Sequence, residues 1–146
     1  MKRKTAFLLS LILSVVFALG AASCGLFGGD EKTVIASVER KEDTMVAIKV
    51  EKAGEDVLFM DVMEYLQEEN ELAFEVSGGM VISINGKANA ADWSASWMLY
   101  TSDEEMANTA WGTYEYNGET LGSAIVGAEA LSVVDGEIYI WVYQEF

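Results

Sequence analysis

Apolar residues alternate with other residues over several short runs of this chain. Val46, Ile48 and Val50 occupy every second position, and this spacing places them on one face of an extended strand. Two further runs with the same period follow at residues 71–76 and 80–84. The alternation predicts three half-buried strands before residue 85.

Between the first two runs, the apolar spacing changes to that of a helix. The residues that recur at i, i+3, i+4 and i+7 are Phe59, Val62, Met63 and Leu66. This spacing predicts one amphipathic helix whose apolar face packs on a sheet. We expect Asp56 to cap its N-terminus and Asn70 to end it, because asparagine tolerates the left-handed conformation.

Dipeptides that favour tight turns divide the second half of the chain into strands. Asn85-Gly86 and Asn117-Gly118 readily accept the positive φ angles of a type I′ hairpin turn. Strands rich in large side chains are expected at residues 97–100, 111–116 and 137–143. The predicted fold class is therefore α+β, a small and mostly antiparallel β domain with one amphipathic helix.

The last of these strands has two different faces. Its aliphatic side consists of Ile138, Ile140 and Val142, and we expect this side to face the core. Its other side consists of Tyr139, Trp141 and Tyr143. The aromatic side either forms an exposed platform for a ligand or packs against neighbouring loops, because aromatic residues favour strands in both cases.

The first 23 residues have the pattern of a secretory signal. A basic start and an apolar run at residues 6–19 are followed by small residues directly before Cys24. This arrangement resembles the lipobox of bacterial lipoproteins, in which the cysteine is lipidated and becomes the mature N-terminus. The alternative is a plain transmembrane helix, since residues 6–23 approach the length that spans a bilayer.

The lipoprotein interpretation divides the chain into three parts. A signal peptide is expected at residues 1–23, lipidated Cys24 and a Gly-rich flexible tether at 24–43, and one folded domain at 44–146. The diacylglycerol on Cys24 would anchor the protein to the cell membrane on its extracytoplasmic face. Cys24 is the only cysteine, so the domain has no internal disulfide and depends on the packing of its core.

Charge and composition narrow the classes of function. All 24 acidic residues follow Cys24, whereas three of the nine basic residues precede it, so removal of the signal changes the net charge from −15 to −18. This charge repels phosphate backbones, and no nucleic-acid partner is expected. The chain has no histidine and no Gly-rich phosphate loop. Although paired carboxylates can hydrolyse glycosides, no spacing singles out a pair, and we expect neither an enzyme nor a cofactor.

Three segments carry a family resemblance: SING at residues 83–86, SWMLY at 96–100 and DGEIYIWVY at 135–143. With these segments, residues 44–146 resemble the DUF4430 family of bacterial surface domains, which is similar to the C-terminal β-domain of transcobalamin and intrinsic factor. The resemblance implies a β-grasp-like fold and a corrinoid such as cobalamin as ligand. It also implies a set of candidate ligand-binding residues: Trp97, Tyr100, Tyr139, Trp141 and Tyr143.

Three hypotheses for function follow from the sequence. The first is a surface-anchored bacterial lipoprotein with a small-ligand-binding domain. The vitamin carriers clasp cobalamin between two domains, so one domain alone is expected to bind weakly unless a partner surface protein completes the site. The second is a protein–protein or cell-surface interaction module without a small ligand. The third is a calcium-dependent domain that uses the carboxylates of residues 103–105, although no EF-hand spacing is present and no metal ligand is predicted.

Overall fold

Two antiparallel sheets and one helix make up residues 32–146, the part of the chain that the computed structural model describes. In chain order the elements are β1 (Val34–Glu42), β2 (Met45–Ala53), α1 (Phe59–Glu68), β3 (Phe74–Ser77), β4 (Met80–Ile84), β5 (Lys87–Ala88), β6 (Ala95–Thr101), β7 (Ala107–Tyr116), β8 (Glu119–Ala124) and β9 (Ile138–Glu145). The small, mostly antiparallel α+β class is therefore confirmed. The expected signal peptide and the lipidation site at Cys24 lie outside the described residues.

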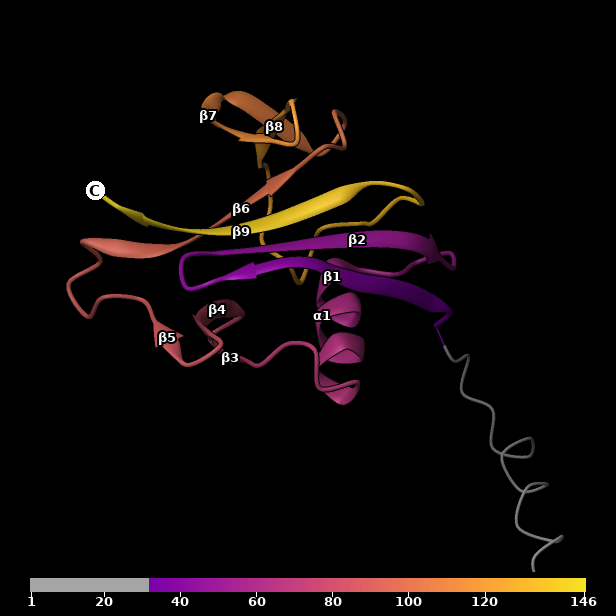
Figure 1. The fold of residues 1–146 in the computed structure, drawn as a ribbon, viewed down its shortest axis with the longest axis horizontal. Helices are drawn as coiled ribbons and strands as arrows, with labels where there is room; N and C mark the ends of the chain where they lie inside the picture. Colours follow the sequence, from indigo (N-terminus) through magenta and orange to yellow (C-terminus); the bar gives the residue numbers. More distant parts are fainter. Residues whose placement is uncertain (1–31) are drawn as a thin grey trace, which may run out of the picture. The chain divides into compact units, whose positions relative to one another are not determined.

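The larger sheet has six strands in the order β1-β2-β9-β6-β8-β7, and the smaller sheet has the order β3-β4-β5. In Figure 1, α1 and the small sheet lie below β1, β2 and β9, and the β7–β8 hairpin lies above them. The central strand β9 pairs with β2 on one side and with β6 on the other. Within residues 32–146, no helix is long and apolar enough to cross a membrane.

Strand β1 overturns the expected boundary between tether and domain. It pairs with β2 from Val34, opposite Ala53, to Glu42, opposite Met45. The compact unit therefore begins at Lys32 rather than at Thr44, and residues 34–42 are not a tether. The sequence signal is weak here because β1 is an edge strand whose second half carries four consecutive charged residues.

Helix α1 has the apolar face that its sequence predicts. Its buried residues are Phe59, Val62, Met63 and Leu66. The predicted end is also confirmed, since Asn70 adopts a φ of 61° just after the helix. The predicted cap at Asp56 is wrong, because the N-cap is Leu58, whose N–H donates to Asp61 Oδ2 at 2.8 Å. A carboxylate in the first turn takes up this otherwise free N–H and complements the helix dipole.

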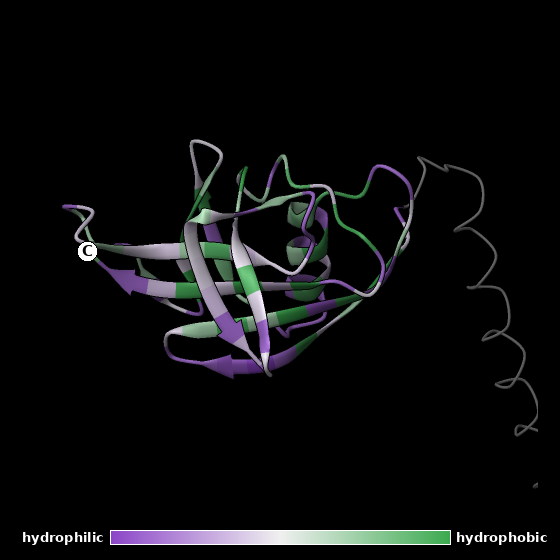
Figure 2. Ribbon diagram, turned by 90° about the horizontal axis from the view of Figure 1, so that it is seen from above, coloured by the Kyte–Doolittle hydropathy of each residue, from purple (hydrophilic) through white to green (hydrophobic). Residues whose placement is uncertain are grey.

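The six-stranded sheet buries apolar residues on both faces. One face packs against α1 and the small sheet, and Phe59 stacks on Tyr139 there with ring centroids 4.8 Å apart. On the other face, Ile140 and Val142 of β9 pack with Leu121 beneath the β7–β8 hairpin. Figure 2 shows hydrophobic residues in the strands and in α1, and also along some of the connecting loops. The aliphatic side of β9 is thus buried as expected, but the aromatic side is buried as well.

Both Asn-Gly turns join neighbouring strands, but the strand that follows Asn85-Gly86 is not the expected strand at residues 97–100. Asn117 and Gly118 connect β7 to β8, and both adopt positive φ. Asn85 and Gly86 connect β4 to the two-residue strand β5, whereas the strand that contains Trp97 belongs to the other sheet. At the start of the predicted strand at residues 80–84, the alternation places Met80 on the buried face. In the structure Met80 is half exposed and its neighbour Val81 is buried.

Candidate functional site

The five candidate aromatic residues do not form an exposed platform. Trp97, Tyr139, Trp141 and Tyr143 share the sheet face that packs on α1, and Tyr100 lies on the opposite face. All except Tyr143 are buried. The hypothesis of an exposed aromatic platform is therefore wrong, because α1 and the small sheet cover the side of β9 that carries its aromatic residues.

Two of these aromatic residues hold β5 in place. The indole Nε1 of Trp97 donates to the carbonyl of Lys87 at 2.8 Å, and the hydroxyl of Tyr143 donates to the carbonyl of Ala88 at 3.2 Å. The two rings meet edge to face, with centroids 5.4 Å apart. These two side chains thus provide hydrogen-bond donors for both backbone carbonyls of β5.

Tyr139 and Tyr100 are buried, and their hydroxyl groups form hydrogen bonds within the domain. Tyr139 has no exposed surface, and its hydroxyl accepts a hydrogen bond from the N–H of Val134 at 3.0 Å. Burial raises the pKa of Tyr139 to about 12, because the phenolate would be poorly solvated there. Tyr100 donates its hydroxyl hydrogen to Oε1 of Gln144 at 2.8 Å on the other face. Neither tyrosine lines the two cavities described next.

Trp97 and Trp141 line a cavity of about 430 Å³ together with the more exposed Trp93. We call this cavity the indole pocket. Its walls come from the start of β4, from β6, from residues 123–128 and from Trp141 of β9. Four of its lining residues are large hydrophobic side chains exposed to solvent: Met80, Trp93, Ile125 and Val126. A mostly apolar cavity of this size falls within the range of small-ligand sites, about 300–1,000 Å³.

Trp141, which lines the indole pocket, has a buried donor without a partner in the described part of the chain. Its side chain is only 5% exposed, and Nε1 has no hydrogen-bond partner within residues 32–146. By contrast, both ends of the Asn89 amide in the same pocket have a partner, since Nδ2 donates to the carbonyl of Val81 at 3.2 Å and Oδ1 accepts from the N–H of Trp97 at 2.9 Å. A buried donor without an acceptor is destabilising by about 1–3 kcal/mol. The indole N–H of Trp141, unpaired among residues 32–146, is therefore destabilising unless an acceptor reaches it.

The backbone of Trp93 is strained. Its φ is 62°, a left-handed conformation that is rare for a bulky side chain, and the side chain is 54% exposed. The turn is held by Asp92, whose Oδ1 accepts hydrogen bonds from the N–H of Ser94 at 3.1 Å and from its hydroxyl at 2.6 Å. The hydroxyl bond in particular lowers the pKa of Asp92. Strained residues cluster at functional sites, and this strain holds an indole at the indole pocket.

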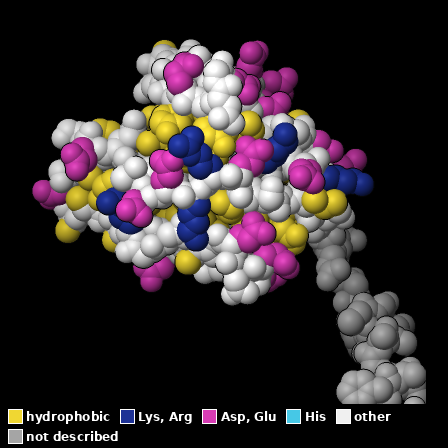
Figure 3. All heavy atoms as spheres, viewed as in Figure 1, with side chains coloured by type: hydrophobic (Ala, Val, Ile, Leu, Met, Phe, Trp, Pro, Cys, Tyr) yellow, Lys and Arg dark blue, Asp and Glu magenta, His cyan; other side chains and the backbone are white. Residues whose placement is uncertain are grey.

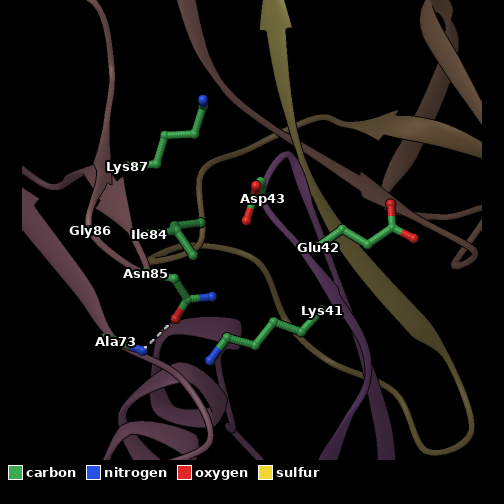
Figure 4. Close-up of a pocket in the computed structure, with 8 residues that line it drawn as sticks. All are labelled: Lys41, Glu42, Asp43, Ala73, Ile84, Asn85, Gly86 and Lys87. Carbon is green, nitrogen blue, oxygen red and sulfur yellow. Dashed lines mark hydrogen bonds between the residues drawn. The ribbon is translucent and has the colours of Figure 1, made fainter.

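A second and more polar cavity of about 690 Å³ lies between the β1–β2 turn and the β4–β5 turn. We call it the amide pocket. It is lined by Lys41, Glu42, Asp43, Ala73, Ile84, Asn85, Gly86 and Lys87. Figure 4 shows the amide nitrogen of Asn85 turned toward the side of Lys41 and Asp43. This nitrogen is buried and has no hydrogen-bond partner in the described part of the chain.

The third hypothesis assigns calcium to the carboxylates of residues 103–105, but one of these carboxylates already accepts a hydrogen bond. Asp103 Oδ1 accepts a hydrogen bond from the N–H of Glu105 at 3.0 Å, so this carboxylate already has a partner. Among residues 32–146, no group of three acidic side chains is close enough to hold a metal ion. On the face shown in Figure 3, acidic side chains are scattered and the basic side chains stand singly among them.

Most residues around the two pockets carry no signal in the sequence. Trp93 and Met80 lie in or beside short segments whose burial cannot be deduced from periodicity. The pair Ile125 and Val126 is the exception, because apolar residues in a small-residue loop indicate an exposed patch. Asn85 is predicted as a turn residue, but the free donor of its side chain depends on the fold.

Comparison of the chain with protein-family models, with curated proteins and with solved structures finds no match in any of the three.

Proposed function

We propose that the chain is a surface-anchored bacterial lipoprotein whose domain binds a small, mostly apolar ligand in the indole pocket. The observation that carries this proposal concerns Trp141, a residue that lines an apolar cavity and whose buried Nε1 has no hydrogen-bond partner among residues 32–146. The ligand offers apolar surface to the walls and one hydrogen-bond acceptor to the indole N–H. The membrane anchor of this proposal is the lipid on Cys24.

A corrinoid is the specific ligand that the family resemblance supports. Its macrocycle has apolar edges, and its peripheral amides supply acceptor oxygens for the indole N–H of Trp141. A corrinoid is much larger than a cavity of about 430 Å³, so the indole pocket covers one side of it at most. Binding by the domain alone is then weak, and a partner surface protein strengthens it by covering the other side. We also propose that the domain has the β-grasp-like fold that the resemblance to the vitamin carriers implies.

Calorimetry on a chain that begins at Gly25 tests this function. The titrants are cobalamin, cobinamide and 8-anilinonaphthalene-1-sulfonate, a smaller probe that combines aromatic rings with acceptor oxygens. The matched variants are Trp93→Ala and Trp111→Ala, because both side chains are more than half exposed and only Trp93 lines the indole pocket. We expect Trp93→Ala to weaken binding about tenfold, or about 1.4 kcal/mol, and Trp111→Ala to leave it unchanged. Absence of heat with all three titrants, or equal effects of the two variants, contradicts the proposal.

The exposed rim of the indole pocket supports a second candidate function. Met80, Trp93, Ile125 and Val126 together present apolar surface to solvent, and such patches mark protein–protein contacts as well as ligand sites. In this case a partner protein inserts an apolar side chain into the pocket. A photo-crosslinking residue at position 80, in cells, distinguishes the two functions, since one defined partner is trapped only if the pocket is a protein interface.

A further inference from the structure

The orientation of the Asn85 side chain is fixed by two hydrogen bonds to one residue. The N–H of Asn85 donates to the carbonyl of Ala73 at 2.7 Å, and the N–H of Ala73 donates to Asn85 Oδ1 at 3.1 Å. Because Oδ1 is the acceptor, Nδ2 occupies the other end of the amide, and Figure 4 shows it facing the interior of the amide pocket. The wall of the pocket thus contains a preorganised amide N–H₂ group that is buried and has no acceptor among residues 32–146.

Two lysines add positive charge to the walls of the amide pocket. Lys41 extends toward Asn85 in Figure 4, and its Nζ reaches the carbonyl of Glu71 at 3.4 Å. Lys87 also lines the pocket, but Figure 4 shows its side chain directed away from Asn85, and its Nζ is 4.4 Å from the centre of the Tyr143 ring. Residues 32–146 contain six lysines and arginines in total, so this acidic domain places a third of its positive charges at one pocket.

The amide pocket has two acidic residues, Glu42 and Asp43, and one of them is paired with an arginine outside the pocket. Glu42 Oε1 pairs with Arg40 at 2.5 Å, and Figure 4 shows the Glu42 side chain directed away from Asn85. Figure 4 shows Asp43 between Lys41 and Lys87, without a hydrogen bond drawn to either of them. The carboxylate of Asp43 repels a dianion such as phosphate more strongly than it repels a monoanion.

We propose that the amide pocket binds a small molecule through a carboxylate group. One carboxylate oxygen accepts a hydrogen bond from Asn85 Nδ2, and the other interacts with the ammonium group of Lys41. The strongly acidic surface outside the pocket repels polyanions, so the ligand is a small monoanion rather than an acidic macromolecule. This site is separate from the indole pocket and does not depend on the function proposed there.

A nuclear magnetic resonance titration of the full-length chain in neutral detergent tests this site. Sodium acetate is the probe, and sodium chloride at equal ionic strength is the reference. We expect the side-chain amide signals of Asn85 and the backbone amide signal of Gly86 to shift saturably with acetate and not with chloride. Equal, unsaturable shifts with both salts overturn the proposal. A saturable response to inorganic phosphate that is as strong as the response to acetate overturns the carboxylate class.

Asn85→Asp is the decisive variant, because it keeps the acceptor for the N–H of Ala73 and replaces the free N–H₂ group by an oxygen. The matched control is Asn117→Asp, which makes the same charge change at the other Asn-Gly turn, where φ is also positive. We expect Asn85→Asp to weaken the acetate response of Gly86 by at least about tenfold and Asn117→Asp to preserve it. Equal acetate affinity in the two folded variants shows that Asn85 is not a ligand-binding residue. If Asn85→Asp does not fold, Lys41→Met is compared with Lys52→Met, and equal affinity of these two variants overturns the proposal.

Discussion

The indole nitrogen of Trp97 donates a hydrogen bond to the carbonyl oxygen of Lys87, and this 2.8 Å contact ties the six-stranded sheet to the small sheet. The two residues also belong to different pockets, since Trp97 lines the indole pocket and Lys87 lines the amide pocket. One bond therefore fixes a wall of each site. Trp141 lies on the neighbouring strand β9, where it packs near Phe59 of α1, and its indole nitrogen has no such acceptor among residues 32–146.

The first prediction concerns the side of α1 that packs on the sheet. Leu66 is fully buried and Glu64 is exposed on the opposite side of the helix. We expect Leu66→Ala to lower the free energy of unfolding by about 2–5 kcal/mol, because it empties a core position. Glu64→Ala is expected to change it by no more than about 0.5 kcal/mol. Denaturant melts of both variants check this, and similar losses would mean that the helix packs on another face.

The second prediction is a loss of stability in alkali. The pKa of Tyr139 is about 12 in the folded protein, against an ordinary value of 10.0. Above pH 10 the unfolded chain loses this proton while the folded chain keeps it, so stability falls as the pH rises from about 10 to about 12, by about 2–3 kcal/mol in total. Below pH 10 this residue contributes no pH dependence.

Tyr139→Phe removes this contribution, and unfolding experiments at several pH values between 9 and about 12 measure it. Burial also raises the pKa of Tyr116, so the variant retains a shallower slope. An identical slope in the wild type and in Tyr139→Phe would show that Tyr139 titrates normally.

The third prediction isolates the backbone strain at Trp93. Replacement by alanine and by glycine removes the same indole, but only glycine adopts a φ of 62° without strain. We expect Trp93→Gly to be more stable than Trp93→Ala by about 1 kcal/mol. At Trp111, within β7, the order reverses, because glycine weakens a strand by about 0.5–1 kcal/mol relative to alanine. Thermal melts of the four variants give both differences, and the same order at both positions would exclude strain at Trp93.

The fourth prediction concerns the membrane anchor. The sequence Ala21-Ala22-Ser23-Cys24 predicts that the protein partitions with membranes and that Cys24→Ala disrupts lipidation and processing. Metabolic labelling with a fatty acid measures this directly. Equal incorporation of label into the wild type and Cys24→Ala would rule out the lipoprotein interpretation.

The local features of this fold could be predicted from the sequence because each depends on neighbouring residues. The buried face of α1 follows from the spacing of Phe59 to Leu66, and both Asn-Gly turns follow from the backbone freedom of these residues. The packing of β9 could not be predicted in the same way. Alternation shows that Ile140 and Trp141 point to opposite faces, but it does not show that other elements cover both.

The pockets could not be predicted because tertiary structure brings their walls together. The indole pocket combines Met80, Ile125 and Trp141, which lie far apart in the chain. In the amide pocket, Lys41 and Asp43 come from a segment whose charge and glycine content favour a tether. Its assignment to the folded unit depends on the pairing of β1 with β2, which a single edge strand does not reveal in its own sequence.

The most direct test of the proposed function is the indole N–H resonance of Trp141 in the chain that begins at Gly25. The protein has four tryptophans, and the Trp→Phe variants assign their four signals. During titration with cobinamide or 8-anilinonaphthalene-1-sulfonate, we expect the Trp141 signal to shift saturably as its N–H gains an acceptor. The Trp97 signal is the internal control, because its N–H is already bonded to Lys87 and is expected to move little. A ligand that binds without shifting the Trp141 signal would contradict the account.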